Sequence, residues 1–252
     1  TTSRDNQTLV TVSLAPGVAG TLGGTRTVRV VGGVANFTDL TLTGTPTPSD
    51  ANGAISSDVS SPNNYKLVFT TSRFQSQQSN NLHLVHKSPA AVQVTSHPTQ
   101  LKAGLAQTSN TVVRVVDVDG NLITDWDRLQ IAGPKVTAGY SLVGDAAVTE
   151  TFTGTKDISV IRTGAGRGTA TFTDLAIGAS AGSKTITYSY SGSVDSVTSA
   201  SASVTLVGGA PAKLVEVVAP PVQVSAGVNF TANPRVKLQD GWNNDTSEAG
   251  SA

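Results

Sequence analysis

The chain has 252 residues, with 17 Lys and Arg against 17 Asp and Glu, and only 13% of its residues are charged. This balance excludes the basic field of a nucleic-acid-binding protein and leaves no acidic tract for a cationic partner. Cys is absent, which excludes disulfides, thiolate metal sites and a cysteine nucleophile, and no apolar run is long enough to span a membrane. A weakly charged, Cys-free chain rich in Val and Thr is typical of β-structured proteins outside prokaryotic cells, so an extracellular or cell-surface location is expected.

Short segments with a period of two predict strands along nearly the whole chain. They are rich in β-branched residues, and Gly, Pro, Asn and Asp separate them at intervals of about 8–12 residues, as in a β-sandwich. No segment of helical length carries an apolar stripe at period 3.6, so very little helix is expected. The clearest predicted strands are 9–14, 27–30, 65–69, 92–94, 112–116, 184–190, 202–206 and 235–238.

Two insertions interrupt this pattern. Residues 44–64 are rich in Pro, Ser and Asn and predict a long surface loop. Residues 139–157 include some apolar positions and predict a decorated hairpin or a partly covered loop. Loops of this length in compact domains are usually functional or mobile, but neither insertion holds a recognisable binding motif.

The chain contains a broken internal repeat. GVANFTDL at 33–40 matches GTATFTDL at 168–175, and the Phe and Leu of both copies (Phe37, Leu40, Phe172 and Leu175) are expected in the core. The segments 89–92, 103–104 and 113–117, which open a unit, are matched by 211–214, 226–227 and 236–240. Residues 88–208 therefore form one complete unit, 1–87 the C-terminal part of a unit that lacks its opening, and 209–252 an opening that lacks its end.

The repeat resembles the bacterial immunoglobulin-like repeats found in tandem in secreted adhesins and invasin-type surface proteins. The residues that carry the resemblance are the Pro-Ala opening, the Ala-Gly of 103–104, VRVVDVDGN at 113–121, GTATFTDL at 168–175 and KTITYSY at 184–190. The resemblance implies an all-β fold of tandem immunoglobulin-like β-sandwiches, one complete and one split between the two ends of the chain. It also implies a role as spacer, stalk or scaffold.

No catalytic constellation is expected. His83, His86 and His97 are the only histidines, and the first two fall on opposite faces of a strand, which is poor chelating geometry. No serine lies in a Gly-x-Ser-x-Gly elbow, so a hydrolase or an enzyme's accessory domain is the least supported function. The glycine-rich stretch 164–168 resembles a phosphate-binding loop, but no helix follows it, and it predicts a β-turn.

One acidic cluster resembles a calcium loop. DVDGN and the residues after it place oxygen ligands around a glycine turn, without the bidentate Glu of an EF-hand. Two interpretations stay open: a structural calcium site, or an Asx-rich turn whose side chains cap backbone amides. No other cofactor is expected. Trp126 and Trp242, each close to an Asp-rich turn, predict either a carbohydrate platform or a core residue. The candidate calcium ligands are Asp117, Asp119, Asn121 and Asp125, with Asp127 nearby.

The missing half-units predict self-assembly. A unit without its opening would expose the inner faces of its strands, and the C-terminal opening has no sheet of its own to cover. We therefore expect residues 209–252 to complete the sandwich of 1–87 in the next subunit, as a head-to-tail homopolymer. The rivals are covalent continuity in a longer tandem polypeptide and a fold-back within one molecule. The residues expected to assemble are Leu214, Val215, Val217, Val236 and Leu238 on one side, and Leu9, Val10 and Val12 on the other.

The function expected from this pattern is that of an extracellular structural subunit of a fibre or surface layer. The alternative is an immunoglobulin-like stalk or ligand-binding segment of a large adhesin, whose loops contact a glycan or a cell surface.

Overall fold

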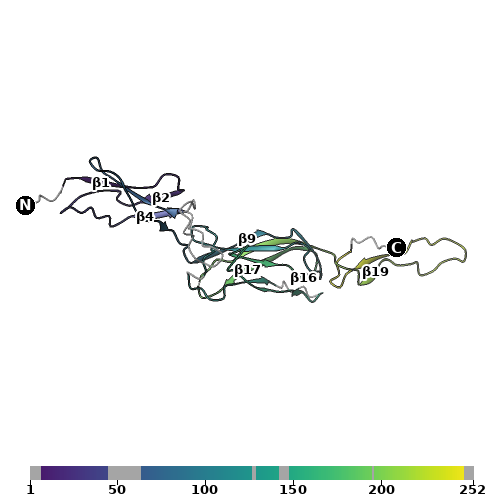
Figure 1. The fold of residues 1–252 in the computed structure, drawn as a ribbon. Coiled ribbons are helices and arrows are strands. Elements are labelled where there is room, and N and C mark those ends of the chain that lie inside the picture. Colours follow the sequence, from purple (N-terminus) through teal and green to yellow (C-terminus); the bar gives the residue numbers. More distant parts are fainter. Residues whose placement is uncertain (1–6, 45–63, 127–128, 142–147, 195, 247–252) are drawn as a thin grey trace, which may run out of the picture. The chain divides into compact units, whose positions relative to one another are not determined.

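The computed structural model describes residues 7–44, 64–126, 129–141, 148–194 and 196–246, and these residues form strands and turns without any helix (Figure 1). Each predicted strand is present, which confirms the all-β fold. Residues 45–63 of the first insertion lie outside the described residues. No helix that could cross a membrane is found in the part of the chain that the structure describes.

Contacts divide the chain into two compact bodies. The first consists of 1–89, 117–131 and 162–167, and the second of 90–116, 132–161 and 168–252. Residues 117–131, which lie within 88–208, therefore belong to the first body, which the repeat did not indicate. The boundaries 1–87, 88–208 and 209–252 stay a prediction.

The whole unit, residues 88–208, holds two main sheets and a two-stranded ladder. The larger sheet has the order β10 (Gln100–Lys102), β18 (Ala200–Val207), β17 (Gly182–Ser191), β12 (Lys135–Tyr140), β14 (Asp157–Ser159). The smaller sheet has the order β15 (Thr169–Phe172), β11 (Thr111–Asp117), β9 (Pro89–Ser96). The ladder pairs β13 (Thr151–Thr153), which lies in the second insertion, with β16 (Ala176–Gly178).

The core of the whole unit is built on the repeated motif. Phe172 and Leu175 are fully buried, as predicted, and the Phe172 ring lies 5.3 Å from the ring of Tyr188 on β17. β17 and β18 alternate between buried and less buried residues, which is the pattern of strands with one face on a core. Large buried aromatics of this kind dominate the stabilisation of small cores.

The split unit, residues 1–87, repeats the ladder of the whole unit and the larger sheet without its edge strand β10. Its sheet has the order β3-β1-β6-β7, β2 pairs with β4, and β5 pairs with β8. The strand bounds are β1 (Leu9–Leu14), β2 (Gly20–Gly23), β3 (Thr27–Arg29), β4 (Thr41–Gly44), β5 (Asn64–Tyr65), β6 (Leu67–Thr70), β7 (Gln77–Gln78) and β8 (Leu82–His83).

Individual hydrogen bonds fix the correspondence between the two units. The amide of Val12 donates to the carbonyl of Arg26 at 2.8 Å, and the amide of Ala138 donates to the carbonyl of Lys156 at the same distance. The sheet partner of Val12 is Phe69, and that of Ala138 is Tyr188. β1, β3 and β6 are therefore the counterparts of β12, β14 and β17.

A side-chain clasp is also repeated. The backbone N–H and the hydroxyl of Thr25 donate to the carboxylate of Asp39 at 2.9 and 2.8 Å. Thr155 donates to Asp174 at the same two distances. In both units the preceding glycine has a positive φ, and a Cβ there would lie less than 2.5 Å from the carbonyl oxygen of the Asp. Only glycine fits this approach, which explains the Gly-Thr pair before each FTDL motif.

The split unit lacks the smaller sheet. The described part of 7–88 contains no counterpart of β9, β10 or β11, and residues 34–37, which correspond to β15, join no sheet beyond the isolated bridge of Val34 to Val31. Phe37 and Leu40, predicted in the core, are only half-buried, although the Phe37 ring still contacts Phe69 at 5.7 Å. In the described part of 7–89, the fully buried apolar residues are Val12, Leu22, Val30 and Tyr65.

Candidate self-assembly site

The C-terminal hairpin pairs β19 (Lys213–Val218) with β20 (Arg235–Gln239) and repeats the opening of the whole unit. In the whole unit Gly104 has a φ of 71°, and the amide of Leu105 donates to Lys102 at 3.1 Å. The hairpin segment has the same turn: Gly227 has a φ of 76°, and the amide of Val228 donates to Ser225 at 3.2 Å. Residues 223–231 are thus the counterpart of 100–108.

An aspartate at the end of β11 and another at the end of β20 make the same set of hydrogen bonds. Asp117 accepts bonds from the backbone and side-chain N–H groups of Asn121, and from the amides of Asp119 and Lys87.

Asp240 accepts the same bonds from Asn244, and from the amides of Trp242 and Gly209, at 2.8–3.0 Å. We call these two arrangements the Asp clamps. They align Asp117 with Asp240, and Lys87 with Gly209.

The Asp240 clamp binds its carboxylate in the ionised form. Burial acts to raise the pKa of Asp240, but the N–H donors of Gly209, Asn244 and Trp242 outweigh it, and the pKa lies below the usual value of 3.8. The clamp also ties the hairpin to the whole unit. The Asn244 side chain donates to the carbonyl of Ala179 at 2.9 Å and accepts from the amide of Ala181 at 2.5 Å.

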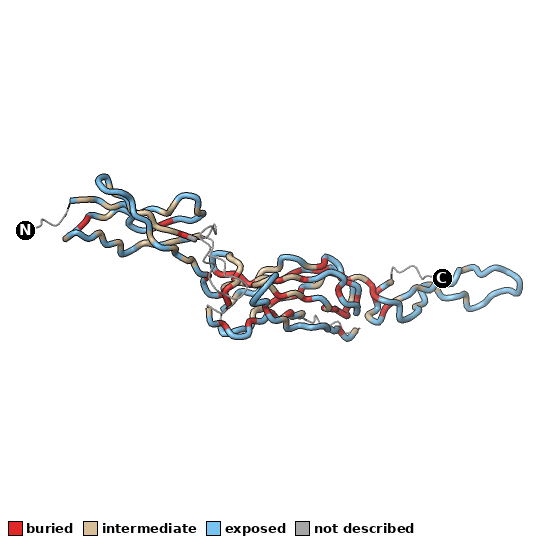
Figure 2. Tube along the Cα trace, viewed as in Figure 1, coloured by how far each residue is buried: buried red, intermediate tan, exposed pale blue. Residues whose placement is uncertain are grey.

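The hairpin differs from its counterpart in what covers it. Apolar positions that are buried in the whole unit are exposed in the hairpin, where β19 and β20 form a two-stranded sheet among the described residues (Figure 2). Four pairs of counterparts show the contrast in exposed fraction, with the residue of the whole unit given first and that of the hairpin second. They are Val92 (4%) and Leu214 (67%), Leu101 (3%) and Val224 (55%), Val113 (0%) and Val236 (64%), and Val115 (0%) and Leu238 (40%). Exposed apolar residues in such a cluster mark an interaction surface.

The assembly residues expected on β19 and β20 are mostly exposed. Leu214, Val217, Val236 and Leu238 lie open to solvent, and Val215 is half-buried. The expected residues of the split unit are placed differently. β1 is paired with β3 on one edge and β6 on the other, and Val12 is fully buried, so β1 is not an open edge.

The open part of the split unit lies at residues 34–38. Val31 and Val34 exchange backbone hydrogen bonds at 2.8 and 3.1 Å and are 72% and 64% exposed. In the whole unit the amide of Ile161 donates to the carbonyl of Thr169, the counterpart of Val34, at 2.9 Å, and the chain then enters β15, which pairs with β11. The segment is positioned like β15 but has no β11. The GVANFTDL match includes residues 34–38, but the assembly residues expected from the sequence did not.

The candidate calcium ligands turn to different partners. Both carboxylate oxygens of Asp117 accept N–H bonds in the clamp, Asp119 lies 2.8 Å from the Lys87 ammonium, and Asp125 lies 2.6 Å from Nδ1 of His86. Asp127 lies outside the described residues. Across the described ranges, no group of three or more His, Asp or Glu side chains is placed to hold a metal ion. The geometry favours the Asx-turn interpretation, and calcium binding stays a prediction.

The remaining sequence candidates have structural roles. Trp126 is buried, and the Trp242 ring lies where a Cβ on Gly104 or Gly178 would clash, with its indole N–H donating to Thr149 at 3.2 Å. The glycine-rich stretch 164–168 is a turn that leads into β15, as predicted. The buried contact between Nδ1 of His86 and the carboxylate of Asp125 was not predicted, because these residues are far apart in the sequence.

Comparison with known proteins yields low-similarity structural neighbours. No family model matches the sequence, and no curated protein matches it. One neighbour is FdeC, an Escherichia coli adhesin, at 15% identity and a TM-score of 0.40, covering 96% of this chain and 65% of that chain. A second is domains 4–9 of the surface layer protein SbsC, at 17% identity and a TM-score of 0.32, covering 75% of this chain and 27% of that chain.

A third neighbour is a glycosyl hydrolase family 2 member from Bacteroides cellulosilyticus, at 17% identity and a TM-score of 0.30. It covers 56% of this chain and 17% of that chain. The chain thus spans less than two thirds of each of these neighbours. At these TM-scores the likenesses do not decide between a structural, an adhesive and an enzymatic role.

Proposed function

We propose that this chain is an extracellular structural subunit that assembles head-to-tail by strand complementation into a fibre or a surface layer. In the proposed contact, the hairpin segment 209–246 of one copy supplies the opening strands that the split unit of the next copy lacks. Main-chain hydrogen bonds provide affinity in such a contact, and alternate side chains fill the core.

The observation that carries the proposal is the contrast in exposure between equivalent positions. Val113 and Val115 on β11 are completely buried, whereas Val236 and Leu238 on β20 are 64% and 40% exposed. Burial of apolar side chains contributes about 25 cal/mol per Å². The hairpin therefore has the side chains of a core strand without the core, and the split unit has the core without those strands.

The contact joins two different surfaces. A heterologous contact of this kind does not need to close into a ring, and it propagates as an open row of copies. The absence of Cys excludes disulfide cross-links between neighbouring copies.

Deletion of 209–252 tests the proposal. Full-length protein is expected to form polymers that are visible by electron microscopy and sediment in the ultracentrifuge, and the truncated protein is expected to form none. The matched control is Val118→Ser, an exposed apolar position outside the hairpin, which should polymerise normally. If the truncated protein forms the same polymers, complementation is wrong. If the full-length protein stays monomeric at high concentration, the adhesin-stalk alternative is favoured.

A further inference from the structure

The repeat also determines how the hairpin segment would dock, which deepens the proposed function and rests on it. In the whole unit the opening segment does not join one sheet only. β9 and β11 belong to the smaller sheet, whereas β10 lies on the edge of the larger sheet beside β18. An opening segment that repeats this arrangement must contact its partner at two separate edges.

The first edge follows from the pairing of β11 with β15. Val113 lies opposite Ala170, and Arg114 lies opposite Thr169. The counterparts of Val113 and Arg114 are Val236 and Lys237, because the Asp clamps align Asp117 with Asp240. The counterparts of Ala170 and Thr169 are Ala35 and Val34, because the FTDL motifs align. This places Val236 opposite Ala35 and Lys237 opposite Val34 in the next copy.

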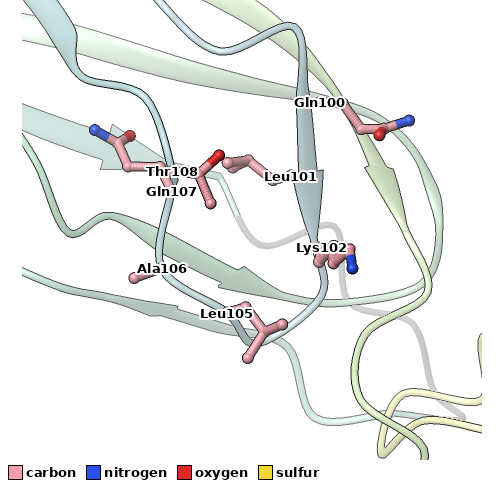
Figure 3. Close-up of a pocket in the computed structure, with 7 residues that line it drawn as sticks. All are labelled: Gln100, Leu101, Lys102, Leu105, Ala106, Gln107 and Thr108. Atoms are coloured by element: carbon pink, nitrogen blue, oxygen red, sulfur yellow. The ribbon is translucent and has the colours of Figure 1, made fainter. Parts of the chain in front are cut away.

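The second edge follows from the parallel pairing of β10 with β18. Leu101 lies opposite Leu206, and Lys102 lies opposite Val207. Figure 3 shows Leu101 on the opposite side of the strand from Gln100, as the alternation of a strand requires. Leu101 and Leu206 are both almost fully buried. The same turn at Gly104 and Gly227 identifies Val224 and Ser225 as the counterparts of Leu101 and Lys102 in the hairpin segment.

The acceptor for this second edge is the chain just after β8. Lys87 and Gly209 each donate an amide to an Asp clamp, so the residues three positions before them, Leu84 and Leu206, correspond. β18 continues through Leu206 to Val207, whereas β8 ends at His83, and Val85 is 45% exposed. Parallel addition of 223–225 would extend this strand by the length that β18 has in the whole unit.

We infer that the hairpin segment of one copy docks on two edges of the next copy's split unit, with antiparallel addition of β20 to residues 34–36 and parallel addition of 223–225 to residues 83–85. Phe230 lies between the two docking strands in the sequence. Its counterpart Gln107 is buried and donates to the carbonyl of Phe172 at 2.5 Å. Phe230, 47% exposed, therefore becomes an aromatic anchor at Phe37, the counterpart of Phe172.

Cysteine cross-linking tests the register, because the natural chain contains no Cys. Two single variants, Val34→Cys and Lys237→Cys, are mixed and mildly oxidised, and the products are resolved on a non-reducing gel. We expect a covalent dimer that contains one copy of each variant, since directly opposed strand residues satisfy disulfide geometry. The pair Val85→Cys and Ser225→Cys is expected to give the same product at the second edge.

The matched control is Asn36→Cys mixed with Lys237→Cys. It shifts the pair by two residues on the same face, where the separation exceeds the reach of a disulfide, and should give at least about tenfold less dimer. Equal yield from the control and the in-register pair would overturn the register. If the wild-type protein forms polymers but the mixture of Val85→Cys and Ser225→Cys gives no covalent dimer, the second edge is overturned and the proposed function stands.

The double variant Val34→Cys with Lys237→Cys separates the two ways in which the hairpin can pair. A ladder of covalent multimers is expected. A monomer that carries an internal cross-link, with no dimer from the mixed single variants, would overturn docking between copies. Wild-type protein that forms no polymer would overturn the proposed function itself, whatever the cross-links show.

Discussion

The pair β9–β11 and the pair β19–β20 are two copies of one element in different surroundings. In each pair a glycine turn lies between the two strands and an Asp clamp follows the second strand, with the same hydrogen bonds in both copies. The backbone of the second copy is therefore formed without a sandwich around it. What the second copy lacks is burial: Val113 is fully buried and Val236 is 64% exposed. Local hydrogen bonds thus determine the shape of the element, and its surroundings determine how much apolar surface it buries.

The two FTDL segments give the same comparison from the acceptor side. Asp39 and Asp174 form identical clasps, yet Phe37 is half-buried and Phe172 is fully buried. The difference is the smaller sheet, which covers Phe172 and is missing from the split unit.

Truncation of the core aromatic should have the largest effect. Phe172→Ala is expected to lower the free energy of unfolding by about 3–5 kcal/mol, as for other buried aromatics. Phe37→Ala should cost less than half as much in single copies, because its ring is only partly covered. Chemical denaturation of both variants measures the difference. Equal costs would mean that the split unit is as well packed as the whole one.

Loss of an Asp clamp should have the next largest effect. Asp240→Asn and Asp117→Asn each replace an ionised acceptor of several N–H groups, and each is expected to cost about 2–3 kcal/mol. Hydrogen exchange should rise at the amides of Gly209 and Trp242 in the first variant, and of Lys87 and Asp119 in the second. Asp245→Asn, at an exposed carboxylate that lies 2.8 Å from the Lys237 ammonium, is the control and should change stability by less than about 1 kcal/mol.

Truncation of Val236 on β20 should lower stability only when the copies are assembled. Val113→Ala is expected to cost about 2 kcal/mol in all states, from lost burial and the cavity left behind. Val236→Ala should be nearly neutral in dilute, single copies and should cost a similar amount in polymers. Denaturation at low and high protein concentration gives both values. A Val236→Ala variant that is neutral at every concentration would argue against burial of β20.

Acid should weaken both clasps. Hydrogen bonds from the Thr25 hydroxyl and amide lower the pKa of Asp39, and those from the Thr155 amide and hydroxyl lower the pKa of Asp174, below the usual value of 3.8. A carboxyl group with a lowered folded pKa stabilises the protein above its unfolded pKa and loses that contribution as the pH falls through the folded pKa. The thermal unfolding midpoint should therefore decrease as the pH is lowered below 3.8. The decrease should be less steep in Asp39→Asn and in Asp174→Asn than in the wild type.

Chelation should have the smallest effect. Because both carboxylate oxygens of Asp117 accept N–H bonds, dialysis against a chelator is expected to leave the thermal midpoint unchanged. A midpoint that falls on dialysis and recovers on addition of Ca²⁺ would instead favour the calcium interpretation of Asp117, Asp119, Asn121 and Asp125.

The strands and the core motif could be predicted because they depend on local alternation and on one strong internal match. The Phe-Thr-Asp-Leu repeat placed Phe172 and Leu175 in the core correctly. The short strands β2, β4, β13 and β16 were missed, because three or four residues give too little alternation to be recognised.

The acceptor side was harder to predict for a physical reason. Leu9, Val10 and Val12 form an alternating strand, and the sequence alone does not tell whether such a strand has one partner or two. β1 has two partners in its sheet, and residues 35–38 belong to no strand. An incomplete sheet is recognised only when the partners of each strand are known. The alternation of residues within one segment gives no information about those partners.

The hairpin and the open part of the split unit lie on different parts of the chain, and this determines how a row of copies would grow. A row of copies joined in the proposed way always ends in an uncovered hairpin on one side and an open sandwich on the other. The row is therefore polar, and each terminus can be extended or stopped independently. A folded unit with an intact smaller sheet and a free hairpin would terminate the end with the open sandwich, and a split unit without its hairpin segment would terminate the end with the uncovered hairpin.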